Sequence, residues 1–318
     1  MTTHGEEPLP VLRIGNGSVD LAFLPSVGGR LISVRVDGVE LLWRNSEYLD
    51  GDLGTVRARS SWAPLDGTMG SWANLGGSKT WPAPQGWSGP GEWPGPPDPV
   101  IDSGSWDVDV AHDGEDAVVT FTSPDDPRTG LRVVREFRLP ATGTTFRHRV
   151  TFRAIADRPV TWAIWEVCQV DTEMFAGAPS GNPSGVWVGV RGGAEPRALV
   201  ADDGLITVDP PAGGRRRVHV DDVVAKVGFT DADGTLEVRR PDGAGVAWSY
   251  SVLPGAAYPD GGCAAEIWMQ YPTAAPVGGG LRPTARLLEL EALGPLTTLE
   301  PGAETSLEIV WHASSRMS

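Results

Sequence analysis

The sequence predicts an all-β protein, an antiparallel β-sandwich forming a single domain over residues 1–318. Short apolar runs rich in β-branched or aromatic residues recur along the chain between turn residues. No segment keeps a helical period for longer than about two turns. The 41 Gly and 28 Pro fall between the apolar runs, and 13 Trp argue against a disordered chain. A length of 318 residues fits one domain, because large β-sandwiches often exceed the average domain size.

The expected strands follow from these runs in chain order. They span Val19–Phe23, Leu31–Val36, Ala117–Phe121, Leu131–Leu139, Thr145–Phe152, Val160–Val167, Val223–Phe229, Gly245–Val252, Ala264–Tyr271, Arg286–Leu293 and Ser306–Trp311. Their spacing is typical of antiparallel strands joined by hairpins and loops. The Asp-Gly pairs at Asp37–Gly38 and Asp233–Gly234 are typical of tight turns.

The segment Ser60–Pro99 differs from the rest of the chain. It holds five Trp among many Gly and Pro, too many Trp for a linker and too many breaks for a strand. Long loops in compact domains are usually functional, which favours a wall or lid of a ligand site. The alternative is a loop that only packs its aromatic side chains over one end of the sandwich.

The net charge limits the kinds of binding partner that we expect, and the cysteine content indicates the cellular compartment. The formal net charge of −15 repels phosphate backbones and anionic lipids, so we expect no nucleic acid and no membrane partner. Met1–Pro10 shows no secretory signal, and no run approaches the ~18 apolar residues of a membrane helix. Cys168 and Cys263 lie in or beside apolar runs and are expected to be buried free thiols in a reducing cytoplasm.

The sequence carries no established motif for a metal or cofactor. It has no HxH, HExxH or Cys/His cluster, no P-loop, no GxGxxG before a helix and no GxSxG. His148 shares strand parity with Phe146 and Val150, which predicts a core histidine. We therefore expect neither a metal site nor a cofactor.

Strand parity gathers polar and aromatic side chains on the faces opposite the apolar ones. They are Trp165 and Gln169, Lys226, Glu266 with Trp268 and Gln270, and Glu289 with Glu291. Carboxylates and amides bind hydroxyl groups, and an indole covers the apolar face of a ring. This combination predicts a groove for a small-molecule ligand, a carbohydrate or a similar polar ring. The alternative is a solvated face with a stray Trp.

Three segments resemble the galactose mutarotase-like superfamily of aldose 1-epimerases. They are GGRLISVRVDGVELLW from Gly28 to Trp43, NLGGSKTWPAPQ from Asn74 to Gln85, and LLELEALGPLTTLEPGAETSLEIVW from Leu287 to Trp311. The first resembles the N-terminal strand pair of that fold, the second its His-Gly-Gly loop, and the third its C-terminal strand pair. The closest resemblance is to a branch known only as a domain of unknown function. It implies the antiparallel β-supersandwich of that superfamily.

The resemblance also implies roles for individual residues. Glu291 falls at the position of the family's general base, on the penultimate strand. The two family histidines are absent, with Leu75 or its neighbours at the first position and Trp165 near the second. Epimerisation needs an acid as well as a base. Lys79, Lys226 and Glu266 are the candidate acids. Glu266 and Glu291 would repel each other and raise the pKa of one carboxyl.

Three functions stay open at this point. The first is a sugar epimerase or isomerase that uses Glu291, Glu266, Lys79 and Lys226. The second is a carbohydrate-binding protein without chemistry, and the third is a lyase or cyclase acting on a small cyclic metabolite. In each case the expected ligand-binding residues are Trp81, Gln85, Trp165, Gln169, Trp268 and Gln270.

Overall fold

The computed structural model describes residues 8–66, 68–86, 93–175 and 183–316 as two antiparallel β-sheets. In the described residues the remaining elements are short: the four-residue α1 (Pro259–Gly262) and four 3-10 turns. The turns are η1 (Arg59–Ser61), η2 (Met69–Ser71), η3 (Glu173–Phe175) and η4 (Gly278–Gly280). The all-β class and the antiparallel pairing predicted from the sequence are therefore confirmed. None of the helices in these residues is long and apolar enough to cross a membrane.

The larger sheet has 11 strands and carries the candidate functional site. Its order is β1 (Leu12–Gly15), β2 (Val19–Leu24), β3 (Arg30–Val36), β5 (Ser78–Ala83), β10 (Val160–Asp171), β18 (Leu287–Leu293), β17 (Ala265–Gln270), β14 (Val224–Phe229) and β12 (Arg197–Asp203). β4 (Val39–Glu40) pairs with β3, and β19 (Thr297–Leu299) pairs with β10. Strands distant in sequence thus become neighbours, which brings β5, β10, β18, β17 and β14 side by side.

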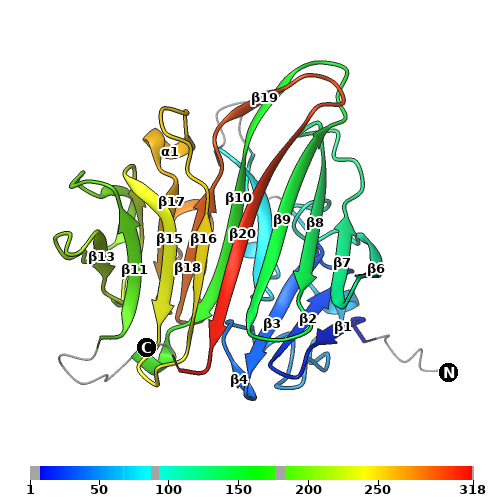
Figure 1. Ribbon diagram of the computed structural model, residues 1–318, viewed down its shortest axis with the longest axis horizontal. Helices are drawn as coiled ribbons and strands as arrows, with labels where there is room; N and C mark the ends of the chain where they lie inside the picture. The colour runs from blue at the N-terminus through cyan, green and yellow to red at the C-terminus, as the bar shows by residue number, and fades with distance from the viewer. Residues whose placement is uncertain (1–7, 67, 87–92, 176–182, 317–318) are drawn as a thin grey trace.

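The smaller sheet has nine strands. Its order is β13 (Arg215–Val218), β11 (Gly185–Val190), β15 (Ala232–Arg239), β16 (Gly245–Tyr250), β20 (Glu304–Ser314), β9 (Thr145–Ala154), β8 (Leu131–Leu139), β7 (Asp116–Thr122) and β6 (Asp107–Asp113). These strands follow one another from left to right in Figure 1. In β8 and β9 every second residue is buried, so one face of each strand packs on the core.

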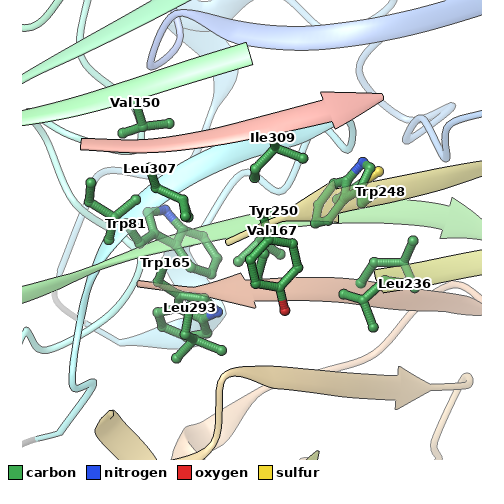
Figure 2. Close-up of a cluster of buried hydrophobic side chains, with 14 of the residues drawn as sticks. Trp81, Val150, Trp165, Val167, Leu236, Trp248, Tyr250, Leu293, Leu307 and Ile309 are labelled. Carbon is green, nitrogen blue, oxygen red and sulfur yellow. The ribbon is translucent and has the colours of Figure 1, made fainter. Parts of the chain in front are cut away.

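The core is a large cluster of aliphatic and aromatic side chains from both sheets. Figure 2 shows part of it, including Leu307 and Ile309 of β20 and Trp248 of β16. Trp248 packs edge-on against Trp311 of β20, with ring centroids 4.9 Å apart. Burial of such side chains stabilises the fold by about 25 cal/mol per Å² of apolar surface.

A buried polar cluster crosses the interior between the sheets. Arg135 of β8 pairs with Glu166 of β10 at 2.8 Å, and both side chains are fully buried. Glu166 also accepts hydrogen bonds from Ser78 and Thr80 of β5. His148 of β9 is buried and accepts a hydrogen bond from Arg135 Nε at 3.2 Å. Because neighbouring residues of a strand point to opposite faces, these contacts fix which face of β10 meets the smaller sheet.

Two local expectations were wrong. The segment Ser60–Pro99 contains β5, which pairs with β10 along its whole length, from Cys168↔Ser78 to Ala163↔Ala83. Trp87 of that segment lies outside the described residues. Asp233–Gly234 lies within β15, and the turn before that strand is at residues 230–231. Asp37–Gly38 does form the tight turn between β3 and β4, with both residues at positive φ.

Candidate functional site

A cavity of about 480 Å³ opens on the face of the larger sheet that points away from the smaller one. Trp165 and Gln169 line it, whereas their strand neighbour Glu166 contacts the smaller sheet. β5, β10, β18 and β14 contribute Trp81, Glu291 and Lys226 among other lining residues, and Trp72 comes from the loop before β5. The cavity has the size and the mixed aromatic and polar lining of a small-molecule site.

The floor of the cavity holds two carboxylates that share one lysine. Glu266 and Glu291 are directly opposite partners on the antiparallel strands β17 and β18. Lys226 of β14 places its Nζ 2.6 Å from Glu266 Oε2 and 2.7 Å from Glu291 Oε2. Trp165 Nε1 donates a 2.6 Å hydrogen bond to the same oxygen of Glu291. Lys226 Nζ also lies 4.4 Å from the centroid of the Trp165 ring, a cation–π distance.

Burial and charge decide where the protons sit. Burial raises the pKa of Glu291 to about 7 against the attraction of Lys226. Burial raises the pKa of Glu266 well above its usual range, and the nearby Glu291 adds to the rise despite Lys226. Burial opposes the charge of Lys226, but the two carboxylates outweigh it and raise the lysine pKa. Near neutral pH the lysine is therefore charged, and the two carboxyl groups hold at least one proton between them.

A second lysine and carboxylate pair lies beside the first. Lys79 Nζ is 3.1 Å from Glu289 Oε1, and Gln169 Nε2 donates a 2.6 Å hydrogen bond to the same oxygen. The Lys79 ammonium lies 4.7 Å from the Trp81 ring centroid and 5.2 Å from that of Trp72. Burial lowers the pKa of Lys79, and Glu289 partly restores it. Glu289 and Glu291 are two residues apart on β18, so both point to the cavity face.

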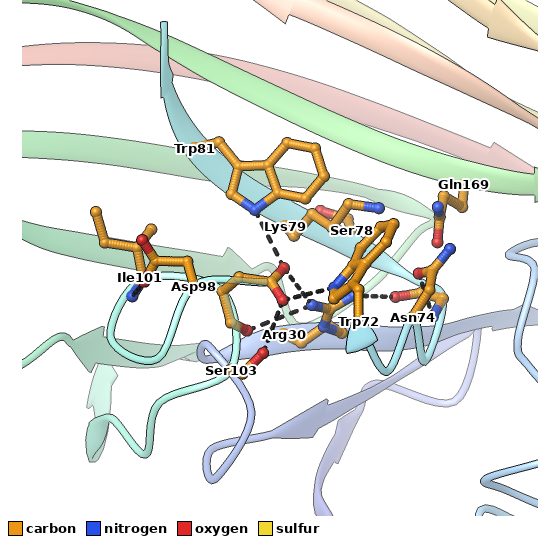
Figure 3. Close-up of polar contacts among 12 residues, drawn as sticks. Arg30, Trp72, Asn74, Ser78, Lys79, Trp81, Asp98, Ile101, Ser103 and Gln169 are labelled. Atoms are coloured by element: carbon orange, nitrogen blue, oxygen red, sulfur yellow. Dashed lines mark hydrogen bonds and ion pairs between the residues drawn. The ribbon is translucent and has the colours of Figure 1, made fainter. Parts of the chain in front are cut away.

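Two tryptophans of the cavity wall are fixed from behind by one carboxylate. Trp72 Nε1 and Trp81 Nε1 both donate to Asp102, at 2.8 and 3.1 Å. Asp102 in turn pairs with the buried Arg30 at 2.8 Å. Figure 3 shows Lys79 between the two indoles and Arg30 below them. The rings are thus held rigidly, which suits them to cover the apolar face of a ligand.

The structure brings most of the sequence-predicted site residues to this cavity. Those that line it are Trp81, Gln85, Trp165, Gln169, Lys226, Trp268, Gln270 and Glu291. Lys79 and Glu266 are buried behind the lining and contact it through Glu289 and Lys226. Leu75, near the place of a family histidine, is buried in a small apolar cluster. Within the described residues, no group of three His, Cys, Asp or Glu side chains is placed to hold a metal ion.

Several contacts and residues of the site had no signal in the sequence. Glu289 was placed on the cavity face by parity, but its pairing with Lys79 had no signal in the sequence. Asp102 and Arg30 lie 72 positions apart, and nothing in the local pattern of either indicates the contact. Asp202 and Asp260, which line the cavity, come from an edge strand and a short turn.

Comparison with solved structures shows a galactose mutarotase-like fold. A TPR-domain containing protein from Parabacteroides distasonis is similar over 97% of this chain, with a TM-score of 0.61 and 14% identity, and this chain spans 47% of it. A galactose mutarotase-like protein from Lactobacillus casei has a TM-score of 0.57 and 13% identity over 96% of this chain and 100% of its own. A putative aldose 1-epimerase from Klebsiella pneumoniae has a TM-score of 0.57 and 12% identity over 96% of this chain and 80% of its own.

None of the curated proteins compared with the sequence matches it. The family described as a domain of unknown function, DUF4380, matches residues 10–314. That match covers nearly the whole chain and both sheets of the sandwich, so the protein belongs to the DUF4380 family.

Proposed function

We propose that the protein is an epimerase or isomerase that acts on a sugar or sugar-like ring bound in this cavity. The observation that carries the proposal is the shared lysine of Glu266 and Glu291. Because one ammonium group neutralises only one of the two charges, a proton on the other carboxyl relieves the repulsion. The pair then offers a base and an acid at neighbouring positions, which is what acid/base isomerisation needs.

The proposed reaction is a ring opening followed by a ring closure. Glu291 takes the proton of the anomeric hydroxyl, and the C1–O5 bond opens to the aldehyde. Glu266 lies behind the lining and gives its proton to the ring oxygen through the Lys226 ammonium, which passes one proton on and takes one up. Rotation about the C1–C2 bond presents the other face of the carbonyl, and ring closure returns both protons. The anomeric oxygen and the ring oxygen are both bonded to C1 and therefore lie close together. A base and a proton source on the adjacent strands β18 and β17 match that short separation. Four tryptophans of the wall, Trp72, Trp81, Trp165 and Trp268, would cover the ring.

A carbohydrate-binding protein without chemistry is the second candidate. Trp165 stands near the position of a family histidine, and its indole donates to Glu291 instead of leaving that carboxylate free. A carboxylate held in this way can serve as a hydroxyl acceptor in a binding site. The two candidates agree on the cavity and on a ring as ligand, and differ only in proton transfer.

The deciding experiment separates binding from turnover. Sugars and small cyclic polyols are screened by thermal shift, and each hit is tested for anomer exchange by NMR exchange spectroscopy. Exchange that is faster than the uncatalysed rate, and that Glu291→Gln removes, supports the isomerase. Binding without faster exchange supports the binding protein. If no ring binds, the proposal is wrong in both forms.

A further inference from the structure

Hydrogen-bond acceptors without partners line the floor of the cavity. Gln169 is 1% exposed and Glu291 is fully buried, and both line the cavity. Gln169 Oε1 and Glu291 Oε1 have no hydrogen-bond partner among the described residues. Gln169 cannot be turned to present its nitrogen, because Nε2 donates to Glu289 at 2.6 Å and an oxygen there would face a carboxylate. A buried acceptor without a partner is costly, so a ligand that donates to these atoms gains affinity.

The aromatic wall offers no donors to balance these acceptors. Trp72 and Trp81 donate to Asp102, on the side of the rings away from the ligand. Trp165 donates to Glu291, and Trp268 Nε1 lies 3.3 Å from Gln270 Oε1. Each indole N–H of this wall is thus bonded within the protein. The tryptophans present only ring surface to a ligand. Lys79 already lies over the Trp72 and Trp81 rings and Lys226 over Trp165, which leaves the Trp268 ring without a protein cation among the described residues.

The lining residues of the cavity carry a net negative charge once the charges of the internal ion pairs are cancelled against each other. Lys79 is paired with Glu289, and Lys226 with both Glu266 and Glu291. The remaining charged lining residues are Asp202 and Asp260. Within the described ranges neither forms an ion pair, although Asp202 Oδ2 accepts a 2.8 Å hydrogen bond from the Gly278 amide. Asp260 is held at φ 52°, followed by two glycines. These two carboxylates favour a positive charge on the ligand.

We propose that the cavity selects a polyhydroxylated ring that carries an ammonium group, an amino sugar or an aminocyclitol, over neutral and anionic rings. The proposal rests on the proposed function in one respect, that the ligand is a ring bound in this cavity. An ammonium group brings three N–H donors for the unpartnered acceptors. It also brings a cation for Asp202 and Asp260 and for the ring of Trp268, which line the same cavity. A phosphate or carboxylate on the ring meets like charge and finds no donor among the indoles.

Matched ligand pairs test the charge preference at constant ring geometry. Titration calorimetry compares glucose with its 2-amino, 3-amino and 6-amino derivatives, each amine with its neutral N-acetyl form, and all with glucuronate and glucose 6-phosphate. The measurements are made below the pKa of the amines. We expect one amine to bind at least about tenfold more tightly than glucose and its N-acetyl form, and the anions to bind weakest. The preference should shrink as salt is added, since partly exposed charges are screened.

A variant pair shows whether the two aspartates carry the preference. Asp202→Asn with Asp260→Asn should bring the amine-to-neutral affinity ratio below about threefold, whereas Asp109→Asn on the exposed strand β6 should leave that ratio as it is. If glucose or an anionic ring binds as tightly as every amine, the charge inference is wrong and the proposed function stands. If the double variant keeps the full ratio, the inference is also wrong. If no ring of any charge binds, the proposed function fails and this inference fails with it.

Discussion

Glu266 of β17 and Glu291 of β18 lie directly opposite each other, and both carboxylates contact the single ammonium group of Lys226. Like charges at directly opposite positions of an antiparallel pair destabilise a sheet. Here the arrangement is fully buried, which strengthens the repulsion, and one lysine can offset only half of it. Buried carboxyl groups whose pKa values are raised by burial and by a like-charged neighbour are typical of functional sites.

Replacing the carboxylates one at a time tests their roles. Glu291→Gln keeps the shape and should lower turnover by about 10²- to 10⁴-fold, because the base is lost. Binding should change by only a small factor. Glu266→Gln should lower turnover by a similar range through loss of the acid. Both are measured as the anomer exchange rate on whichever ring binds, with the dissociation constant measured alongside.

Glu289→Gln is the matched control on the same strand face. Glu289 contacts Lys79 and Gln169 rather than Lys226, so its removal should leave most of the turnover. It should instead lower thermal stability, because Lys79 is buried and would lose its carboxylate partner. Equal loss of turnover in the Glu289 and Glu291 variants would contradict the assignment of the base.

The pH dependence of activity follows from the raised pKa of Glu291, about 7. As the base, Glu291 must be ionised, so kcat/KM should rise with pH and level off above about 7. Two pH units below that value only about 1% of the base is ionised, which lowers kcat/KM about a hundredfold. The protonated partner carboxyl should give a fall at higher pH, and Glu266→Gln should remove that fall. A flat profile between pH 5 and 8 would exclude Glu291 as the base.

The cavity face of the larger sheet was predictable because its central strands alternate. In β18, apolar residues such as Leu290 alternate with Glu289 and Glu291, and one strand face packs on the core. The same alternation places the side chains of Lys226 on β14 and Glu266 on β17 on the cavity side of the sheet. Period-2 patterns fix side-chain direction without any knowledge of the partner strand. The sequence could therefore show which residues face together, but not which of them form pairs.

β5 was not predictable for a physical reason. All six of its residues are buried, so the strand shows no alternation between apolar and polar positions. It also contains Pro82, which cannot donate to a strand partner and normally argues against a central strand. β5 pairs with β3 only at Leu31↔Ser78, so residues 79–83 pair on the β10 side alone. A proline is compatible with such a half-paired strand.

The buried pair of Arg135 and Glu166 gives a prediction on stability. Arg135→Met should destabilise the fold by about 3–5 kcal/mol, because Glu166 would stay buried without its cation. Adding Glu166→Gln should recover part of the loss, since the new side chain is neutral and can still bond with Ser78 and Thr80. Denaturant unfolding of the single and double variants measures both steps. A double variant less stable than Arg135→Met would show that the charge on Glu166 is satisfied by its hydroxyl partners alone.

Lys226→Met tests whether the lysine is needed to keep the two carboxylates together. The methionine keeps apolar contact with the Trp165 ring but removes the only cation within ion-pair distance of Glu266 and Glu291 among the described residues. At pH 8 the variant should be about 3–5 kcal/mol less stable than the natural chain, the usual cost of an uncompensated buried charge. Glu266→Gln in the same chain should restore part of that stability, because it removes the facing charge.

The stability lost in Lys226→Met should change with pH in a definite direction. Without the lysine, the folded pKa values of both carboxyls lie still further above their unfolded values, so the folded state binds protons more tightly than the unfolded chain. Stability from that proton binding is present below the unfolded pKa and is lost as pH rises through the folded pKa. The deficit measured by denaturant unfolding should therefore be small at pH 5 and grow toward pH 8. A deficit independent of pH would mean that Lys226 stabilises the sheet through packing on Trp165, and that the carboxylates do not depend on its charge.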